Sequence, residues 1–311
     1  MTDPLATHEP QSNAVPLLMT GAPGWLCDVL LDQLAKEPSS AKFSVRCLVH
    51  SAIPAERLLK WRLAHPSVLE MSSGTLSNAE SLATACAGMQ GGVVLHAAGV
   101  IHPRRTSEWY EINRDGTLTL AKAAQNAGMR RFVFISSNAA QGVSNRFDVL
   151  MTEEMPCRPT SHYGQSKFEA EQALLKMHQP GRFEIVIARP CMFYGPPVPA
   201  RHIDIFRRIQ RARFPLVGGG HYARSLSYID DLCAGLRLCL AHPAAAGEIF
   251  NLCDLRPYTT REVCDAMSAA LGVQARYLPL PSFCASAAYR IDRVLASFGI
   301  YSMSQFFFFF R

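Results

Sequence analysis

The sequence predicts an α/β fold in which a doubly wound parallel sheet carries a smaller carboxyl-terminal lobe. Short apolar, partly β-branched segments alternate with longer helix-like stretches, and a glycine-bearing turn follows the first apolar segment. This alternation is typical of parallel strands joined by right-handed crossover helices. The length of 311 residues suits one large α/β unit with an appended lobe.

Six apolar segments are the predicted strands of this sheet. They are Val15–Met19, Phe43–Val49, Val68–Met71, Val93–His96, Phe132–Ser136 and Phe183–Ala188. The predicted helices between them span residues 24–36, 77–87, 107–127 and 161–178. After residue 190 the alternation loosens, with one further predicted strand at Ile249–Leu252. We therefore expect a flexible tail over 1–14, the sheet unit over 15–190, the lobe over 191–300, and an anomalous poly-phenylalanine tail over 301–311.

Composition argues against several classes of protein. Hydrophobic residues make up 49% of the chain, and the net charge of +6 is spread along it, which does not favour nucleic-acid binding. The ten cysteines include no CxxC pair, so neither a disulfide framework nor a metal site is expected. Residues 1–14 are polar, and no uninterrupted apolar run is long enough to span a membrane. We expect a cytoplasmic protein that binds a small, anionic ligand.

A glycine-bearing turn, Thr20–Cys27 (TGAPGWLC), joins the first predicted strand to the first predicted helix. Gly21 permits a tight turn, and Gly24 lets backbone amides approach an anion at the positive end of the helix. The third small position of such turns is Cys27, which is compact enough for close helix packing. Taken alone, the turn fits an ordinary glycine-rich connection as well as a dinucleotide-binding loop.

The end of the second predicted strand bears on which dinucleotide such a turn would hold. NAD-binding chains commonly place an acidic residue there for the ribose hydroxyls, whereas NADP-binding chains leave space and positive charge. The segment Val45–Ser51 (VRCLVHS) carries Arg46 and His50 but no carboxylate. The sequence therefore leans slightly towards NADP, with the direction of Arg46 and the position of Arg57 left open.

An ordered set of motifs between residues 15 and about 300 resembles the extended short-chain dehydrogenase/reductase family, also called the NAD-dependent epimerase/dehydratase family. Besides the glycine turn, the motifs are Leu95–Gly99 (LHAAG), Asn113 in INRDGT, Phe134–Gly142 (FISSNAAQG), Tyr163–Lys167 (YGQSK), Ala188–Pro196 (ARPCMFYGP) and Arg224–Asp231 (RSLSYIDD). Their shared order is more specific than any one of them. The resemblance implies an enzyme with a Rossmann-type NAD(P)-binding domain over 15–190, and a homodimer.

The resemblance also implies which residues form the site. Ser137, Tyr163 and Lys167 would be catalytic, and Asn113 would support them from a central helix. The positions expected to bind the cofactor are Gly21, Pro23, Gly24, Trp25, Leu26, His50, Thr75, Leu76, Ala97, Ala98, Gly99, Tyr163, Lys167 and Pro190. Cys191, Met192 and Arg224 would contact substrate, although Arg224 fits a structural ion pair with Asp230 or Asp231 equally well.

Two departures from the family pattern narrow the expected chemistry. The third-strand Gly-Asp-Leu of the family is Gly74–Leu76 (GTL) here, which puts adenine recognition at that point in doubt. Sugar dehydratases of the family carry an Asp-Glu pair directly after the catalytic residue, but Asn138 and Ala139 follow Ser137. Without that acid and base, elimination of water is not expected.

The spacing of Tyr163 and Lys167 suits proton transfer. Four residues apart in a helix, both side chains emerge on one face. A nearby ammonium and the positive charge of an oxidised nicotinamide favour the phenolate over the neutral phenol, whose pKa is ordinarily ~10. Tyr163 could then exchange a proton with a substrate oxygen that Ser137 holds by a hydrogen bond. His96, one residue before the small-residue run, is expected to be a packed core histidine.

Three functions fit these residues. The favoured one is an NAD(P)-dependent oxidoreductase acting on a secondary alcohol or ketone, and the apolar segment 191–193 suits a lipid-like or steroid-like substrate. A nucleotide-sugar epimerase is the alternative, because Arg224 and the mild basicity suit a phosphate-bearing substrate. A non-catalytic NAD(P)-binding sensor is the third, and an intact Ser137, Tyr163 and Lys167 set argues against it.

Overall fold

A computed structural model describes residues 14–36, 43–66, 68–143, 149–199, 203, 206–207, 209–210, 214–274 and 276–284. Except for residue 14, the predicted tail over 1–14 lies outside these residues. The predicted tail over 301–311 lies outside them as well.

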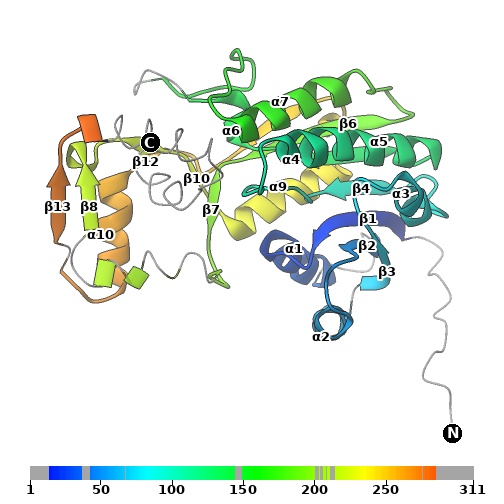
Figure 1. Cartoon of the computed structure of the whole chain (residues 1–311), viewed down its shortest axis with the longest axis horizontal. Coiled ribbons are helices and arrows are strands. Elements are labelled where there is room, and N and C mark those ends of the chain that lie inside the picture. Colours follow the sequence, from blue (N-terminus) through cyan, green and yellow to red (C-terminus); the bar gives the residue numbers. More distant parts are fainter. Residues whose placement is uncertain are drawn as a thin grey trace, which may run out of the picture.

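Seven parallel strands form the central sheet, in the order β3-β2-β1-β4-β5-β6-β11 (Figure 1). They are β1 (Val15–Ala22), β2 (Phe43–His50), β3 (Val68–Gly74), β4 (Val93–His96), β5 (Arg131–Ile135), β6 (Glu184–Pro190) and β11 (Ile249–Leu252). The six predicted strands and the predicted fold class are confirmed. The strand order reverses between β1 and β4, which creates the crevice where doubly wound sheets bind their ligands.

Helices cover both faces of this sheet because successive strand residues point to opposite sides. Leu17 and Met19 of β1 pack with α1 (Trp25–Ala35), α2 (Ala55–Ala64) and α9 (Ile229–Ala241). Leu18 packs on the opposite face with α3 (Ala79–Cys86), α5 (Thr117–Asn126) and α7 (His162–Leu175). Burial on both faces explains why these strands are continuous apolar runs rather than alternating ones.

The helix predicted over 107–127 has an irregular centre. It consists of α4 (Ser107–Tyr110), the π-helical segment η2 (Glu111–Gly116) and α5. A π-helical turn is wider than an α-helical one and is frequent at functional sites. Here it carries Asn113. Apolar periodicity does not distinguish such a turn from an α-helix, so the sequence did not indicate it.

The smaller lobe consists of short elements that the sequence did not specify. They are β8 (Phe214–Val217), η3 (Gly218–Gly220), β9 (Ala223–Arg224), β12 (Tyr258–Thr259), α10 (Thr260–Ala270) and β13 (Tyr277–Leu280). β8 pairs with β13, β9 pairs with β12, and α10 begins with a capping box between Thr259 and Glu262. β7 (Met192–Tyr194) and β10 (Leu226–Tyr228) form a separate two-stranded sheet between the lobe and the main sheet (Figure 1).

Residues beyond 190 also complete the main sheet. β11 pairs with β6 at its edge, and α9 packs against the face that also holds α1. The short η4 (Pro243–Ala245) joins α9 to β11. This part of the chain therefore contributes to both the central sheet and the smaller lobe.

Within the described ranges, no helix is both long and apolar enough to cross a lipid bilayer. All ten cysteines lie in these ranges as free thiols, and most of them are buried.

Candidate active site

The glycine turn after β1 lies directly against the backbone at the end of β4. Gly21 has φ +95°, and a Cβ added there would come 2.8 Å from the carbonyl carbon of Ala97. A Cβ on Gly24 would meet the Gly21 carbonyl oxygen at 2.5 Å. Neither position can hold a side chain, so backbone amides at the start of α1 stay open to an anion. The turn therefore fits the pyrophosphate of a dinucleotide.

The prediction for this turn is that Gly21→Ala lowers dinucleotide affinity about tenfold or more, equivalent to ~1.4 kcal/mol. The added methyl group would displace the turn from the end of β4. Gly88→Ala is the matched control, because Gly88 has a similar φ of +74° with nothing within 4 Å of its would-be Cβ. Both variants carry the strain of a left-handed residue, about 1–2 kcal/mol. Equal dinucleotide affinities, measured by fluorescence titration, would show that close approach at Gly21 does not matter.

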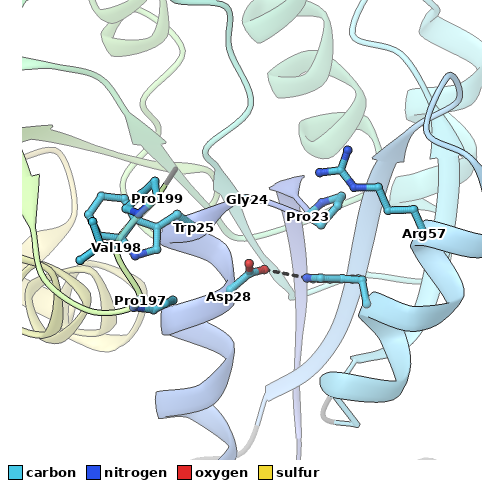
Figure 2. A pocket seen from close by; sticks show the side chains of 9 residues that line it. Pro23, Gly24, Trp25, Asp28, Arg57, Pro197, Val198 and Pro199 are labelled. Atoms are coloured by element: carbon cyan, nitrogen blue, oxygen red, sulfur yellow. Dashed lines mark hydrogen bonds between the residues drawn. The ribbon is translucent and has the colours of Figure 1, made fainter. Parts of the chain in front are cut away.

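A hollow of about 340 Å³ opens beside this turn (Figure 2). Its lining residues are Pro23, Gly24, Trp25, Asp28, Arg57, Trp61, Pro197, Val198 and Pro199. Figure 2 shows the Arg57 side chain extending from α2 towards Pro23. Trp61 Nε1 donates a hydrogen bond of 2.6 Å to Asp28, which fixes α2 against α1. The sequence predicted cofactor contacts for Trp25 and the turn. It did not predict that residues from α2 or segment 197–199 would lie beside them.

Further residues predicted to contact the nucleotide lie at the ends of β2 and β3. His50 ends β2, and its Nδ1 accepts a hydrogen bond from the Ala52 amide. Thr75 follows β3, and Leu76 packs against Gly116 near Asn113. Arg46 is turned elsewhere, pairing with Glu70 at 2.6 Å and donating to the carbonyls of Ala85 and Ala87. Arg46 is therefore engaged at the β3–α3 side, and Arg57 is the arginine beside the glycine turn.

Ser137 and Tyr163 are brought together by the contact of two helices. Ser137 follows β5 and caps α6 (Asn138–Gln141), accepting a hydrogen bond from the Ala139 amide at 3.2 Å. Tyr163 lies in the first turn of α7. A Cβ at Gly164 would come 2.2 Å from the Ala139 carbonyl oxygen, so the absence of a side chain lets the two helices touch. This contact brings the Ser137 hydroxyl close enough to Tyr163 to lower the pKa of its phenol.

Lys167 is buried one turn after Tyr163 on α7. Its ammonium donates to the Ile135 carbonyl at 3.0 Å and lies 4.5 Å from the centre of the Phe134 ring. Burial lowers the pKa of Lys167 to about 8, while Glu171 one turn further on raises it. Burial also raises the pKa of Tyr163, and the nearby Ser137 hydroxyl lowers it. With the chain alone, burial therefore disfavours the charged form of both groups.

Asn113 links the π-helical turn to the loop after β4. Its side chain accepts from the Val100 amide at 2.8 Å and donates to the Val100 carbonyl at 2.9 Å. A Cβ on Gly99 would come 3.0 Å from Asn113 Oδ1 and 3.4 Å from Lys167 Nζ. Gly99, Asn113 and Lys167 thus lie close together, and the role of Asn113 as a support for the catalytic residues stays a prediction.

His96 is a fully buried member of a hydrogen-bonded chain that joins β1, β4 and the central helix. Thr20 Oγ1 lies 2.7 Å from His96 Nδ1 and accepts from the Ala98 amide. His96 Nε2 lies 2.9 Å from the hydroxyl of Thr117, which donates to the Asn113 carbonyl. These directions are mutually consistent when His96 is neutral with its proton on Nε2. Burial and nearby Lys167 lower the pKa of His96 to about 3, so this packed histidine is neutral.

The prediction for His96 concerns acid stability. Its folded-state pKa lies below the unfolded value of ~6.5, so the unfolded state binds more protons and acid favours unfolding. From about pH 7 to pH 5, this residue should remove about 2 kcal/mol from the free energy of unfolding. Urea unfolding of His96→Gln should lack that part of the loss. An exposed-site control, His162→Gln, should follow the wild type, and identical losses in all three proteins would contradict the prediction.

A buried ion pair lies beneath Ser137 and was not indicated by the sequence. Arg189 and Glu171 are 1% and 0% exposed, with contacts of 2.6 and 3.0 Å between guanidinium and carboxylate. Ser136 donates to the same carboxylate, and Arg189 also contacts the Cys157 thiol. Glu171 is thus bound both to Ser136 at the end of β5 and to Arg189 in β6.

The predicted substrate side follows β6. Pro190 ends that strand, Cys191 is buried, and Met192 begins β7. Phe193 packs on Trp25 with ring centroids 4.9 Å apart, which joins this segment to the glycine turn. Arg224 lies on β9, paired with Tyr258, and burial lowers its pKa to about 10. Its predicted contact with a substrate phosphate stays a prediction.

The chain is similar to known proteins over most of its length. It is 36% identical to the uncharacterized protein y4nL of Sinorhizobium fredii (strain NBRC 101917 / NGR234), covering 93% of this chain and 83% of that one. It is 30% identical to a 4-hydroxy-2-methyl-3-oxo-4-farnesyl-3,4-dihydroquinoline-1-oxide ketoreductase of Stigmatella aurantiaca, covering 89% and 79%. It is 33% identical to a UDP-glucose 4-epimerase of Vibrio cholerae, covering 62% and 61%.

A solved structure and a family profile agree with these relatives. The dTDP-glucose 4,6-dehydratase of Streptomyces venezuelae, solved with NAD and TYD bound, superposes with a TM-score of 0.70 at 27% identity, covering 86% of this chain and 84% of that one. The profile of the NAD dependent epimerase/dehydratase family matches residues 17–253. The chain therefore belongs to the NAD-dependent epimerase/dehydratase family, the extended short-chain dehydrogenase/reductases.

Proposed function

We propose that this enzyme is an NAD(P)-dependent oxidoreductase that transfers a hydride to or from a secondary alcohol or ketone. The observation that carries the proposal is the arrangement of Ser137, Tyr163 and Lys167. Ser137 caps α6, which touches the start of α7 at Gly164, next to Tyr163, and Lys167 lies one helical turn further along α7, at the end of β5. All three lie at the carboxyl ends of the parallel strands, at the same edge of the sheet as the glycine turn after β1.

The chain's own residues supply binding, orientation and proton transfer. The Gly21–Gly24 backbone would hold the pyrophosphate, and Lys167 would donate to ribose hydroxyls. A bound nicotinamide would supply the hydride acceptor or donor. Ser137 would orient the substrate oxygen by a hydrogen bond, and Tyr163 would remove its proton during oxidation or return it during reduction. Added positive charge near Tyr163 lowers its pKa and so counters the effect of burial.

The substrate class has two candidates. A ketone or secondary alcohol with an apolar body fits the segment that runs from Cys191 to Phe193, and the ketoreductase relative supports it. A nucleotide-sugar substrate of a 4-epimerase is the alternative, supported by the half-buried cation of Arg224 and by the epimerase relative. Net change in the redox state of the cofactor distinguishes them, because an epimerase produces none over a full cycle.

Elimination of water is not part of the proposal. Asn138 follows Ser137, and its side chain accepts from the Ser137 hydroxyl at 3.4 Å. Ala139, the next residue, packs against α7. Neither residue can act as an acid or base, so a 4,6-dehydratase reaction would lack its proton donor and acceptor at this position.

The choice between NAD and NADP rests on the end of β2 and on Arg57. The family is NAD-dependent, yet this chain has His50 where an acidic residue would bind the ribose hydroxyls. Arg57 lies beside the glycine turn, where its positive charge suits a 2′-phosphate. We therefore keep a slight preference for NADP. Comparison of NAD and NADP affinities in the wild type and in Arg57→Ala tests it, since loss of Arg57 should weaken only NADP.

The experiment that tests the proposal is a titration with NAD and NADP, followed by a substrate screen at the nicotinamide absorbance. Lys167→Ala should lower both dinucleotide affinity and turnover, each by about tenfold or more, because it removes the buried ammonium. Lys122→Ala on the exposed side of α5 is the matched control and should resemble the wild type. If the wild type binds neither dinucleotide, the oxidoreductase and the non-catalytic sensor are both excluded. Binding without turnover on alcohols, ketones or nucleotide sugars would favour the sensor.

Two further expectations stay proposals. A homodimer is implied by the family resemblance, and a cytoplasmic location is implied by the composition. Size-exclusion chromatography with light scattering would test the first, and fractionation of the source cells the second.

A further inference from the structure

Two cysteines lie opposite each other where β6 and β11 end. Pro190 and Leu252 are the last paired residues of these parallel strands, and Cys191 and Cys253 come directly after them. The Cys191 amide donates to the Leu252 carbonyl at 3.2 Å, which extends the pairing by one residue. Adjacent strands lie about 4.8 Å apart, and disulfides join Cα atoms about 4.4–6.8 Å apart. The two thiols are also close enough for each to shift the pKa of the other.

The two thiols differ in exposure and in acidity. Cys253 is exposed, whereas Cys191 is 8% exposed. The Cys191 thiol lowers the pKa of Cys253, although burial and the charges of Asp254 and Glu153 oppose this effect. The Cys253 thiol and burial raise the pKa of Cys191. Because thiolates react with oxidants and thiols do not, Cys253 is both the reachable member and the reactive member of the pair.

The pair lies at the junction between the main sheet and the smaller lobe. The Ser227 hydroxyl of β10 donates to the Leu252 carbonyl at 2.7 Å, and the Asp254 amide donates to the Leu226 carbonyl at 2.7 Å. Ser225, just before β10, lowers the pKa of both thiols. Segment 252–254 thus binds β10, which pairs with β7 in the two-stranded sheet that leads to the lobe (Figure 1).

We propose that Cys191 and Cys253 form a dithiol that a hydroperoxide oxidises to a disulfide, and that this bond restrains the junction and lowers turnover. In the first step, the Cys253 thiolate attacks a peroxide oxygen and becomes a sulfenic acid as hydroxide leaves. In the second, the Cys191 sulfur displaces water from that sulfenic acid and loses its proton. In sum, hydrogen peroxide and the two thiols give one disulfide and two water molecules.

The loss of turnover rests on the proposed function, whereas the chemical step does not. Cys191 is the first residue of the segment expected to contact substrate, and Met192 after it begins β7. A bond to Cys253 would fix the start of that segment to the edge strand of the sheet. The other eight cysteines are less reachable, six being buried and Cys157 and Cys284 partly so.

Peptide mapping of the whole protein tests the chemical step. Wild-type protein would be treated with hydrogen peroxide, blocked with an alkylating agent and digested with trypsin without reductant. We expect a linked pair of peptides, lighter by two hydrogen atoms than their sum, that joins Cys191 to Cys253. Fragmentation separates Cys253 from Cys239, which lies on the same tryptic peptide. Cys253→Ser should form no such link, and Cys284→Ser should form it as the wild type does.

Three results would overturn the chemical step. They are a link from Cys191 to Cys239 that persists in Cys253→Ser, oxidation of Cys253 to a sulfinic or sulfonic acid without a link, and no oxidation of Cys253 while Cys284 reacts. Each would show that the opposed thiols do not form the reactive pair.

Turnover before and after peroxide treatment tests the restraint. Wild type and Cys284→Ser should lose most of their activity and recover it with dithiothreitol, while Cys253→Ser keeps its activity throughout. A link that forms without loss of activity would contradict the proposed effect on turnover, but it would still support formation of the disulfide. An untreated protein that binds no dinucleotide would overturn the proposed function and the effect on turnover together, and the peptide map would still decide the chemical step.

Discussion

Tyr163→Phe is expected to lower turnover by about 10²–10⁴-fold while dinucleotide affinity stays within about twofold of the wild type. The substitution removes the phenolic hydroxyl, whose pKa the nearby Ser137 lowers, and leaves the aromatic ring in place. Proton transfer then has no donor or acceptor at the substrate oxygen. Initial rates at saturating dinucleotide, together with a fluorescence titration of dinucleotide binding, measure the two quantities separately.

The pH dependence of the Tyr163→Phe variant adds a second test. Burial raises the pKa of Tyr163 in the chain alone, so oxidation of an alcohol should accelerate as the pH rises and the tyrosine loses its proton. The variant should lack that acceleration. Tyr277→Phe is the matched control, because Tyr277 lies on β13 in the smaller lobe and bonds to Asp265. Wild-type turnover in Tyr163→Phe would remove this residue from the mechanism.

Arg189→Leu should lower the free energy of unfolding by about 3–5 kcal/mol, because it leaves the carboxylate of Glu171 buried without its cation. The pair is 1% and 0% exposed, so water cannot replace the lost partner. Arg256→Leu is the matched control. Its partner Glu262 lies at 3.0 Å, but both side chains are about half exposed, and such pairs contribute under about 1 kcal/mol. Urea unfolding compares the two variants.

A double variant separates loss of charge pairing from loss of packing. Arg189→Leu combined with Glu171→Leu removes both charges and should recover much of the stability lost in Arg189→Leu alone. If the double variant is no more stable than the single one, packing rather than the uncompensated carboxylate is the cause. If Arg189→Leu costs no more than Arg256→Leu, the buried pair does not stabilise this site.

The sheet could be predicted because burial on both faces leaves a clear record in the sequence. Each central strand is a short apolar run, and each crossover helix has its own amphipathic stretch. The seventh strand was predicted as a segment, but its place beside β6 was not. Strand order depends on which edge remains uncovered after the first six strands have paired, and this is a property of the assembled sheet rather than of Ile249–Leu252.

The smaller lobe was less predictable for a local reason. β9 and β12 are each two residues long, and β8 and β13 each contain a proline, Pro215 and Pro279. Prolines and short spans remove the apolar alternation on which strand prediction depends. Their pairing is set by contact with partners from distant parts of the chain.

The candidate site, like the fold, could be predicted from the sequence only in part. Tyr163 and Lys167 could be placed on one helix face from their spacing alone. Their approach to Ser137 depends on Gly164, whose lack of a side chain lets α7 touch Ala139. The π-helical turn at Asn113 and the position of Arg57 beside the glycine turn also depend on tertiary contacts. The glycine directly after the tyrosine is the local sequence feature that permits this close helix contact.

The adjacent serines at the end of β5 show that the site depends on the exact position of each residue along this strand. Ser136 points into the protein and donates to Glu171, while Ser137 points out towards Tyr163. The two residues are chemically identical, and only the alternation of the strand gives them different partners. Deleting one residue in β5 would therefore leave the local composition almost unchanged, and yet it would move Ser137 into the position of Ser136 and Asn138 into the position of Ser137. A comparison that scores residue identity alone would therefore not detect a change of one position in β5 that abolishes activity.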